Sequence, residues 1–374
     1  MRVLHFFKTY WPDTFGGVER TIHALSKGSC AHGIQSDVLA LSRNPAPASF
    51  PFASHTVHQV HCDFELASTG FSRAAFSRFA ALSKQADVVH YHFPWPFMDV
   101  VELISHHGKP IVVTYHSDIV KQKLLSIVYT PLMHRFLGRA NCIVATSPNY
   151  LASSTVLKRY QDKTRIIPLG LDAADYPPAD PERLAHWRDR FPGGFFLFIG
   201  VLRYYKGIHI LFEAAKQTGL PVVVIGGGDI EAELKARVSA ENVPHFHLTG
   251  PLSDEDKIAL LCLSRALVLP SHLRSEAFGL SLVEAAMFAK PMISCEIGTG
   301  TTFVNKDGET GLVIPPDDPA SLGRAMRCLW NDGSKTEQFG QAARARYLDN
   351  FTARRMVSSY ATLYQDLVSE RTVR

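Results

Sequence analysis

Two successive series of short apolar runs constrain the fold of this chain more than any other feature. The first series has six members: RVLHFF from Arg2, SDVLAL from Ser36, DVVHYH from Asp87, PIVVTYH from Pro110, CIVATS from Cys142 and TRIIPL from Thr164. The second also has six: FFLFIG from Phe195, PVVVIGGG from Pro221, FHLTG from Phe246, ALVLPS from Ala266, PMISCEIG from Pro291 and GLVIPP from Gly311. Their spacing leaves room for a helix between runs, which predicts the buried strands of two parallel sheets.

A polar, proline-rich stretch, DAADYPPADPERL, separates the two series. Because proline can neither continue a helix nor join a central strand, we expect a hinge over residues 171–181. A chain of 374 residues also exceeds what one hydrophobic core usually serves. We therefore predict an α/β protein of two doubly wound, Rossmann-like domains, 1–170 and 171–354, with ligands bound in a cleft beyond the carboxyl ends of the strands.

The C-terminal stretch TARRMVSSYATLYQDLVSE predicts a closing helix. Its apolar residues fall on one helical face, formed by Met356, Tyr360, Leu363, Tyr364 and Leu367. Such a face must pack against another part of the chain to be stable.

Composition excludes several classes of protein. The formal net charge is +4 and no block of five or more like charges is present, so we expect no nucleic acid partner. Six cysteines lie far apart without a C-x-x-C pair, which favours a reducing, cytoplasmic location. The N-terminal apolar run is too short for a signal peptide, and no stretch of 18 apolar residues occurs, so we expect a protein that does not span the membrane.

The stretch SEAFGLSLVE, at 275–284, places carboxylates on both sides of a turn from strand to helix. The backbone N–H groups of Gly279, Leu280 and Ser281 would open the helix without intrahelical partners, which makes an anion site. Glu276 and Glu284 would then flank a diphosphate and accept hydrogen bonds from a sugar and a ribose. The alternative is that both glutamates are ordinary exposed residues.

Two other strand-to-helix turns carry phosphate-binding features. Arg203 and Lys206 follow the first strand of the second series, where two cations would neutralise a diphosphate leaving group. Gly16 and Gly17 follow the first strand of the chain, where glycine lets the backbone approach phosphate closely. The alternatives are solvated surface charges and a plain turn. In addition, His116 follows a strand and would project into the cleft, although a histidine there is more often structural.

Other polar patterns favour structural roles. Ser253 precedes Asp256 by three residues, which is typical of a helix N-cap and not of a metal pair. His90 and His92 share one face of a strand but show no third ligand, so we predict no structural or catalytic metal. The segment 121–139 combines basic and apolar residues, and we expect a core helix, with attachment to a membrane surface as the alternative.

Together these residues resemble the retaining glycosyltransferases with the GT-B fold that are often called family 4. The resemblance covers essentially the whole chain, and its most specific part is the pattern E-x-F-G-[LIV]-x-x-x-E, matched by Glu276, Phe278, Gly279, Leu280 and Glu284. It implies that Glu276 binds hydroxyls of a donor sugar, that Glu284 binds the ribose, and that the amides of Gly279 and Leu280 bind the diphosphate.

The same resemblance extends to the remaining candidates. Arg203 and Lys206 match the family's diphosphate clamp, Gly16 with Gly17 its N-terminal glycine loop, and His116 a histidine that approaches the transferred sugar. It also implies that the helix at 355–374 crosses back to brace the N-terminal domain. No metal or other cofactor is implied.

A narrower similarity concerns the base and the sugar. TGPLSDEDK looks like the segment that reads guanine in mannosyltransferases of this family, through the backbone of Leu252 and the carboxylate of Asp254, with Lys257 nearby. A carboxylate suits the N1–H and N2–H₂ donors of guanine, so we expect a GDP-sugar. The N-terminal half is similar to bacterial mannosyl- and rhamnosyltransferases that build O-polysaccharide of lipopolysaccharide on a lipid carrier.

The resemblance implies transfer of mannose or D-rhamnose to a lipid-linked oligosaccharide with retention of configuration, by a cytoplasmic enzyme that associates peripherally with the membrane. The leaving phosphate would accept the acceptor's proton, and we rank a covalent intermediate on Glu276 second. Three further alternatives stay open: a nucleotide-sugar epimerase or hydrolase with the same fold, a transferase that uses a UDP-sugar, and a non-catalytic glycan-binding protein.

Overall fold

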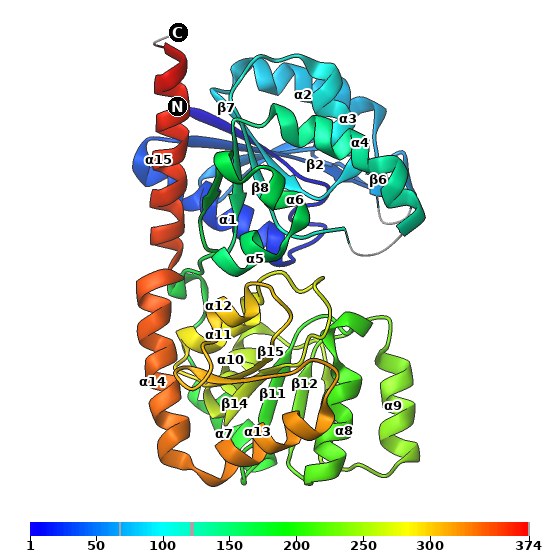
Figure 1. Cartoon of the computed structure of the whole chain (residues 1–374), viewed down its shortest axis with the longest axis vertical. Coiled ribbons are helices and arrows are strands. Elements are labelled where there is room, and N and C mark those ends of the chain that lie inside the picture. The colour runs from blue at the N-terminus through cyan, green and yellow to red at the C-terminus, as the bar shows by residue number, and fades with distance from the viewer. Residues whose placement is uncertain (67–68, 120–122, 373–374) are drawn as a thin grey trace. The chain divides into compact units, whose positions relative to one another are not determined.

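The computed structural model describes residues 1–66, 69–119 and 123–372, and it divides into two compact units (Figure 1). The first unit comprises Met1–Gly170 together with Ala353–Arg374, and the second comprises Leu171–Thr352. The proline-rich residues 171–181 therefore belong to the second unit, where Leu171 pairs with Thr352 in an isolated parallel bridge.

The first unit is built on an eight-stranded sheet with the order β10-β9-β8-β7-β1-β2-β4-β3. All pairs are parallel except β3 with β4, and the central strands are buried along their length, as the apolar runs predicted. A separate two-stranded sheet pairs β5 with β6 antiparallel. The strands are β1 Arg2–Phe6, β2 Gln35–Ser42, β3 Ser49–Phe52, β4 His55–His61, β5 Phe64–Leu66, β6 Thr69–Phe71, β7 Val88–Phe93, β8 Ile111–Tyr115, β9 Cys142–Ala145 and β10 Thr164–Ile166.

Helices cover both faces of this sheet. Figure 1 shows α1 and α15 on one side of it and α2, α3 and α4 on the other. This arrangement follows from strand order, because right-handed crossovers from β1 outward to β2 and from β4 back to β7 lie on opposite faces. The helices are α1 Gly17–Ser29, η1 Cys30–His32, α2 Arg73–Gln85, α3 Pro96–Ser105, α4 Lys123–Arg139, α5 Pro148–Ser153, α6 Thr155–Arg159, η2 Gln161–Lys163 and α15 Ala353–Thr372.

The second unit has a six-stranded, wholly parallel sheet with the order β13-β12-β11-β14-β15-β16. In it α13 packs on α8, α14 on α11 and α7 on α10. The strands are β11 Phe196–Ile199, β12 Val222–Ile225, β13 Phe246–Gly250, β14 Ala266–Leu269, β15 Met292–Cys295 and β16 Gly311–Ile314. The helices are η3 Ala173–Asp175, α7 Pro181–Arg190, η4 Tyr204–Lys206, α8 Ile208–Thr218, α9 Glu231–Ala240, α10 Asp254–Leu263, α11 Leu280–Met287, α12 Thr301–Val304, α13 Pro319–Asn331 and α14 Gly333–Asn350.

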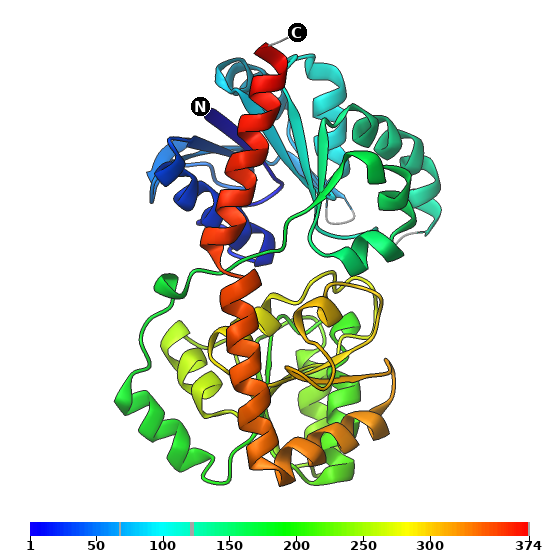
Figure 2. The ribbon, with the colours of Figure 1, turned by 60° about the vertical axis from the view of Figure 1, so that its left-hand side comes forward.

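The C-terminal helix α15 packs on the first unit, although it follows the second in the chain (Figure 2). Four of the five residues of its predicted apolar face are buried, and Leu367 is partly buried. Two tyrosines add buried hydrogen bonds: Tyr360 Oη lies 2.6 Å from Thr114 Oγ1, and Tyr364 Oη lies 2.7 Å from His90 Nδ1. The helix is therefore fixed by polar contacts as well as by apolar burial.

Two further properties concern the helices and the cysteines. Among the helices of the described residues, none combines the length and the apolar character needed to cross a bilayer. The six cysteines, all within the described residues, are free thiols. The predicted core or membrane-surface segment at 121–139 begins outside the described residues, and the described part forms α4 from Lys123.

Candidate active site

The loops after β11 and β14 meet at the carboxyl end of the second sheet. These strands are neighbours, and the backbone N–H of His272 donates to the carbonyl oxygen of Tyr205 over 3.1 Å. Gly207, with φ +71°, lies so close that a Cβ there would be 2.0 Å from the carbonyl oxygen of Pro270. Only glycine permits this approach, which brings residues 70 positions apart in sequence into one site.

Lys206 and Glu276 form an ion pair at this meeting point. Lys206 Nζ donates to Glu276 Oε2, which also accepts a 3.1 Å hydrogen bond from Ser271 Oγ. Burial by itself lowers the pKa of Lys206, but the charge of Glu276 and the hydrogen bond to it outweigh burial and raise that pKa above its ordinary value. Lys206 is therefore a stable cation with its side chain 14% exposed, and Arg203 adds an exposed cation three residues earlier.

Gly279 caps the N-terminus of α11 in the left-handed conformation, with φ +85°. A Cβ there would lie 2.9 Å from Leu269 Cδ2 and 3.0 Å from Leu282 Cδ1. The first N–H groups of an α-helix have no intrahelical partner, so Gly279 and Leu280 bring amide donors and the positive end of the helix dipole to this edge. Phe278 is 4% exposed and packs edge-on against Phe351, which anchors the turn.

Glu284, one turn into α11, belongs to a second polar cluster. Its Oε1 accepts a 2.9 Å hydrogen bond from Tyr176 Oη and lies 3.6 Å from Lys257 Nζ. Lys257 also donates to Asp254 Oδ1 over 2.6 Å, and its Nζ lies 5.3 Å from the centroid of the Tyr176 ring. Lys257 thus links the carboxylates of Asp254 and Glu284. Sequence reasoning missed Tyr176, because nothing in the sequence relates it to residues about a hundred positions away.

The start of α10 confirms the predicted N-cap. Ser253 Oγ accepts from the backbone N–H of Asp256 over 3.2 Å. The carboxylate of Asp256 accepts hydrogen bonds from Trp187 Nε1 and from Arg183, both on α7, and so holds α10 against α7. The carboxylate of Asp254, 55% exposed, remains at the helix start, and the backbone of Leu252 lies two residues before it.

In the first unit, Gly16 and Gly17 open α1 as the sequence predicted. The loop before them is organised by Glu19, which is 7% exposed and accepts hydrogen bonds from Thr9 Oγ1 at 2.9 Å and Thr14 Oγ1 at 2.8 Å. Sequence reasoning did not single out Glu19. The available signal was an acidic residue in the first turn of a helix that begins with glycines.

His116 directly follows β8 and is 9% exposed. Its backbone N–H donates to the carbonyl oxygen of Phe93, and its Nε2 lies 3.0 Å from His92 Nδ1. The prediction that His90 and His92 share a face is confirmed, but a third potential ligand, which the sequence did not show, lies beside them. His5, on β1 beside β7, brings a ring nitrogen within 4.8 Å of nitrogens of both. The sequence could not reveal this because strand order decides it.

A second group of three potential ligands lies in the second unit: His209, His272 and Asp317. The group is loose, since His272 Nε2 and Asp317 Oδ1 are 3.9 Å apart and the Asp317 side chain is 63% exposed. The rings of Tyr204 and His209 stack with centroids 5.1 Å apart, and both meet His272 edge-on. Aromatic packing therefore accounts for these positions.

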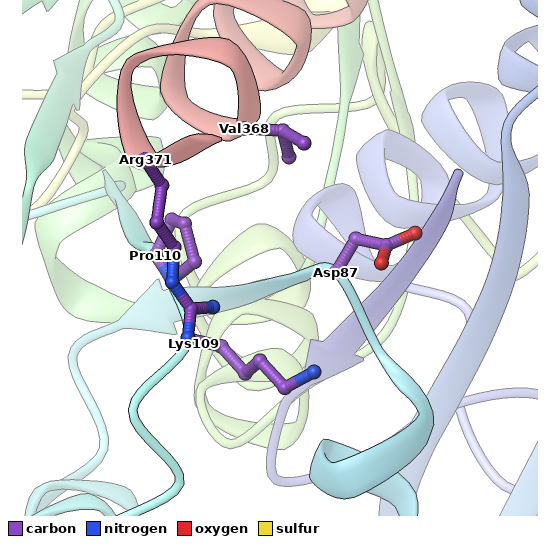
Figure 3. Close-up of a pocket in the computed structure, with 5 residues that line it drawn as sticks. All are labelled: Asp87, Lys109, Pro110, Val368 and Arg371. Atoms are coloured by element: carbon purple, nitrogen blue, oxygen red, sulfur yellow. The ribbon is translucent and has the colours of Figure 1, made fainter. Parts of the chain in front are cut away.

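A pocket of the first unit lies at the end of its sheet that is opposite to the carboxyl ends of the strands (Figure 3). Asp87 and Pro110 precede β7 and β8, so the pocket is at the amino ends of these strands. Figure 3 shows Arg371 extending from α15 toward Lys109, and Asp87 lies across the pocket from Arg371. Ligands of open α/β sheets bind beyond the carboxyl ends, so this pocket is not the candidate active site.

The fold places the chain in a class. Its structure matches that of sucrose-phosphate synthase from Thermosynechococcus elongatus with a TM-score of 0.83 and 20% identity over 99% of both chains. It also matches Anabaena Alr3699/HepE in complex with UDP, with a TM-score of 0.78 and 18% identity over 98% of this chain and 100% of the other. Two Rossmann-like units with these neighbours define the GT-B class.

Sequence comparison gives the family. Residues 191–346 match Glycosyl transferases group 1, and residues 15–175 match Glycosyltransferase Family 4. D-rhamnosyltransferase WbpZ of Pseudomonas aeruginosa is 53% identical over 94% of this chain and 93% of its own length. O-antigen chain mannosyltransferase C of Escherichia coli is 48% identical over 99% of this chain and 100% of its own length. The chain belongs to the family 4 (group 1) glycosyltransferases, as its motifs predicted.

Proposed function

We propose that this glycosyltransferase moves mannose or D-rhamnose from a GDP-sugar to a hydroxyl of a lipid-linked glycan in O-polysaccharide synthesis. The sugar class and the pathway are supported by the two full-length relatives, whose names describe a D-rhamnosyltransferase and an O-antigen chain mannosyltransferase. The chain follows both relatives over more than nine-tenths of their lengths.

One observation carries the proposed chemistry: a stable cation, Lys206, and the N-terminus of α11 lie at the same carboxyl edge of the second sheet. Cleavage of the sugar–phosphate bond leaves negative charge on the β-phosphate. Lys206, Arg203 and the amides of Gly279 and Leu280 would stabilise this charge, and one such donor is worth on the order of 3 kcal/mol in the transition state. Since these groups neutralise the diphosphate, we propose that no metal is required.

Glu276 is proposed to bind hydroxyls of the transferred sugar. Its Oε2 is engaged by Lys206 and Ser271, which fixes the carboxylate and leaves Oε1 for a ligand. A carboxylate paired with a cation is a weak nucleophile, so a covalent intermediate stays the second choice. Mass spectrometry of intact protein after rapid quenching tests this choice, because a glycosyl adduct on Glu276 would reverse it.

The base and ribose are assigned to the cluster around Lys257. Glu284 would accept from the ribose hydroxyls, and Asp254 from the N1–H and N2–H₂ of guanine, with the backbone of Leu252 beside it. The 2.6 Å contact of Lys257 with Asp254 and its 3.6 Å contact with Glu284 support a single preorganised polar cluster for the nucleoside. On the first unit, Gly16, Gly17 and His116 are proposed to bind substrate, as the family resemblance implies.

The test is a donor panel with purified protein. GDP-mannose, GDP-D-rhamnose and the UDP-sugars UDP-glucose and UDP-galactose are incubated with and without a lipid-linked glycan primer, and the product anomer is determined by NMR. We expect transfer from a GDP-sugar, only with primer, to give an α-linkage. Donor turnover without primer would indicate an epimerase or hydrolase, preference for UDP would refute the base assignment, and loss of activity in EDTA would refute metal independence. Sedimentation with vesicles tests the proposed peripheral membrane association.

A further inference from the structure

Four histidines gather on three adjacent strands of the first sheet and just beyond them. His5 lies on β1, His90 and His92 lie on β7, and His116 directly follows β8. Three of them are at most 1% exposed and His116 is 9% exposed. The rings of His5 and His92 stack with centroids 5.5 Å apart, and those of His92 and His116 with centroids 5.3 Å apart. The cluster is therefore a continuous column that ends at the candidate catalytic histidine.

A hydrogen-bond chain runs through three of these rings. His5 Nδ1 lies 3.2 Å from His92 Nε2, and His92 Nδ1 lies 3.0 Å from His116 Nε2. Burial lowers the pKa of His5 and of His116 to about 3, and it lowers the pKa of His92 well below 6.5, so all three rings are neutral near pH 7. A neutral imidazole has one N–H and one lone pair. The protons of the chain must therefore all point the same way.

The environment of His5, at one end of the hydrogen-bond chain, decides in which direction its N–H groups point. His5 Nε2 is buried and has no hydrogen-bond partner among the described residues. If the chain ran from His116 toward His5, this nitrogen would carry an N–H without an acceptor, and orphaned buried N–H groups are rarer than unsatisfied acceptors. In the other direction it carries only a lone pair. His5 then donates from Nδ1 to His92, and His92 donates from Nδ1 to Nε2 of His116.

We propose that His5 and His92 are positioning residues that hold His116 as the tautomer protonated on Nδ1, so that His116 presents an N–H donor to the substrate. This inference rests on the proposed role of His116. An N–H can bond a sugar hydroxyl or a phosphate oxygen, whereas the lone pair of the other tautomer would repel an anionic oxygen. The hydrogen-bond chain therefore decides whether His116 presents an N–H or a lone pair to the sugar donor.

His90 belongs to a separate network, which also accounts for the cluster without a metal. Its Nδ1 lies 2.7 Å from Tyr364 Oη and its Nε2 lies 2.7 Å from Thr114 Oγ1. Both nitrogens of His90 and both of His92 are thus used by protein hydrogen bonds. A metal ion held by His5, His90 and His92 would have to break several of these bonds.

The direct test is NMR of the wild-type protein with ¹⁵N-labelled histidine, which distinguishes a protonated ring nitrogen from a bare one. The His116 signals are assigned by their loss in His116→Gln. We expect Nδ1 of His116 to be protonated and Nε2 to be bare. Protonation on Nε2 would overturn the proposal, and so would one bound zinc per chain that is lost in His5→Asn. This measurement needs no sugar donor, so it determines the tautomer of His116 even if the proposed sugar is wrong.

Two variants of His92 then separate positioning from mere packing. Asparagine places an amide N–H₂ close to where Nδ1–H lies, so His92→Asn should keep the His116 tautomer and a kcat within a few-fold of wild type. Aspartate can only accept there, so His92→Asp should move the proton to Nε2 and lower kcat about 10- to 100-fold. Equal kcat in the two folded variants would refute the positioning role of the hydrogen-bond chain. If His92→Asp does not fold, the wild-type tautomer still decides.

Discussion

Lys206 is the residue on which the proposed chemistry depends most. Replacing it by alanine removes the cation that we propose to stabilise the leaving phosphate, so we expect Lys206→Ala to lower turnover by at least about 100-fold. The cost to folding should stay near 1–3 kcal/mol, because Glu276 loses its partner but keeps the hydrogen bond from Ser271. Lys216→Ala is the matched control, since Lys216 pairs with Glu241 on the surface of the same unit. Steady-state rates and circular dichroism report both effects, and unchanged turnover would remove Lys206 from the site.

Asp254 tests the base at the same scale. Asp254→Ala should weaken GDP binding about tenfold or more, because a charge-assisted hydrogen bond to guanine is lost, and it should leave UDP binding nearly unchanged. Isothermal titration with both nucleotides measures this difference, with Glu255→Ala on the same helix turn as control. Because Asp254 also holds Lys257, a change transmitted through Lys257 to Glu284 would weaken both nucleotides alike. Equal losses of GDP and UDP affinity would therefore contradict recognition of guanine by Asp254 and would indicate an effect on ribose binding.

At the scale of elements, the turn into α11 depends on Gly279. Alanine at φ +85° costs about 1–2 kcal/mol, and its Cβ would also press on Leu269 and Leu282. Gly194→Ala separates these effects, since Gly194 has φ +83° and a Cβ there meets nothing within 4 Å. We expect urea unfolding to show a larger loss for Gly279→Ala, by about 1–3 kcal/mol. Only Gly279→Ala should weaken GDP binding, and equal stability losses would show that the contact with Leu269 relaxes freely.

Of the strands in the described residues, sequence reasoning missed β3, β4, β5 and β6, and β4 is the longest of these four. All twelve apolar runs contain strands, because runs of Val, Ile, Leu and Phe give a direct signal, although β10 is largely exposed. β4 was missed because its sequence, HTVHQVH, is nearly half histidine. Tertiary partners make that strand possible: His58 Nε2 lies 2.8 Å from Asp37 Oδ1, and His55 Nε2 lies 3.0 Å from Tyr10 Oη.

The candidate site shows the same limit. The motif from Glu276 to Glu284 could be read locally, because the strand, turn and helix that position it are contiguous. The pairing of Lys206 with Glu276 and the link from His5 through His92 could not be read, since each depends on which strands become neighbours. Periodicity identifies strands and faces, but it does not give strand order.

At the scale of the whole molecule, buried neutral histidines make the two units respond differently to acid. In the first unit burial lowers the pKa of His5 and His116 to about 3, below the 6.5 of an unfolded chain. The folded state binds fewer protons than the unfolded state between these values. Stability is therefore full above about pH 7 and decreases as the pH falls from 6.5 toward 3.

Between pH 7.5 and pH 5 these two histidines alone should cost the first unit about 2 kcal/mol each, while ordinary carboxylates stay ionised. In the second unit burial also lowers the pKa of His209, His247 and His272, but the charge of Asp317 opposes this lowering for His209 and His272, so the loss should be smaller. Hydrogen exchange resolved by segment at both pH values measures the two units in one sample. His5→Asn should flatten the dependence in the first unit only, because asparagine does not titrate. Parallel losses in both units, or a dependence that His5→Asn leaves unchanged, would show that another group controls acid stability.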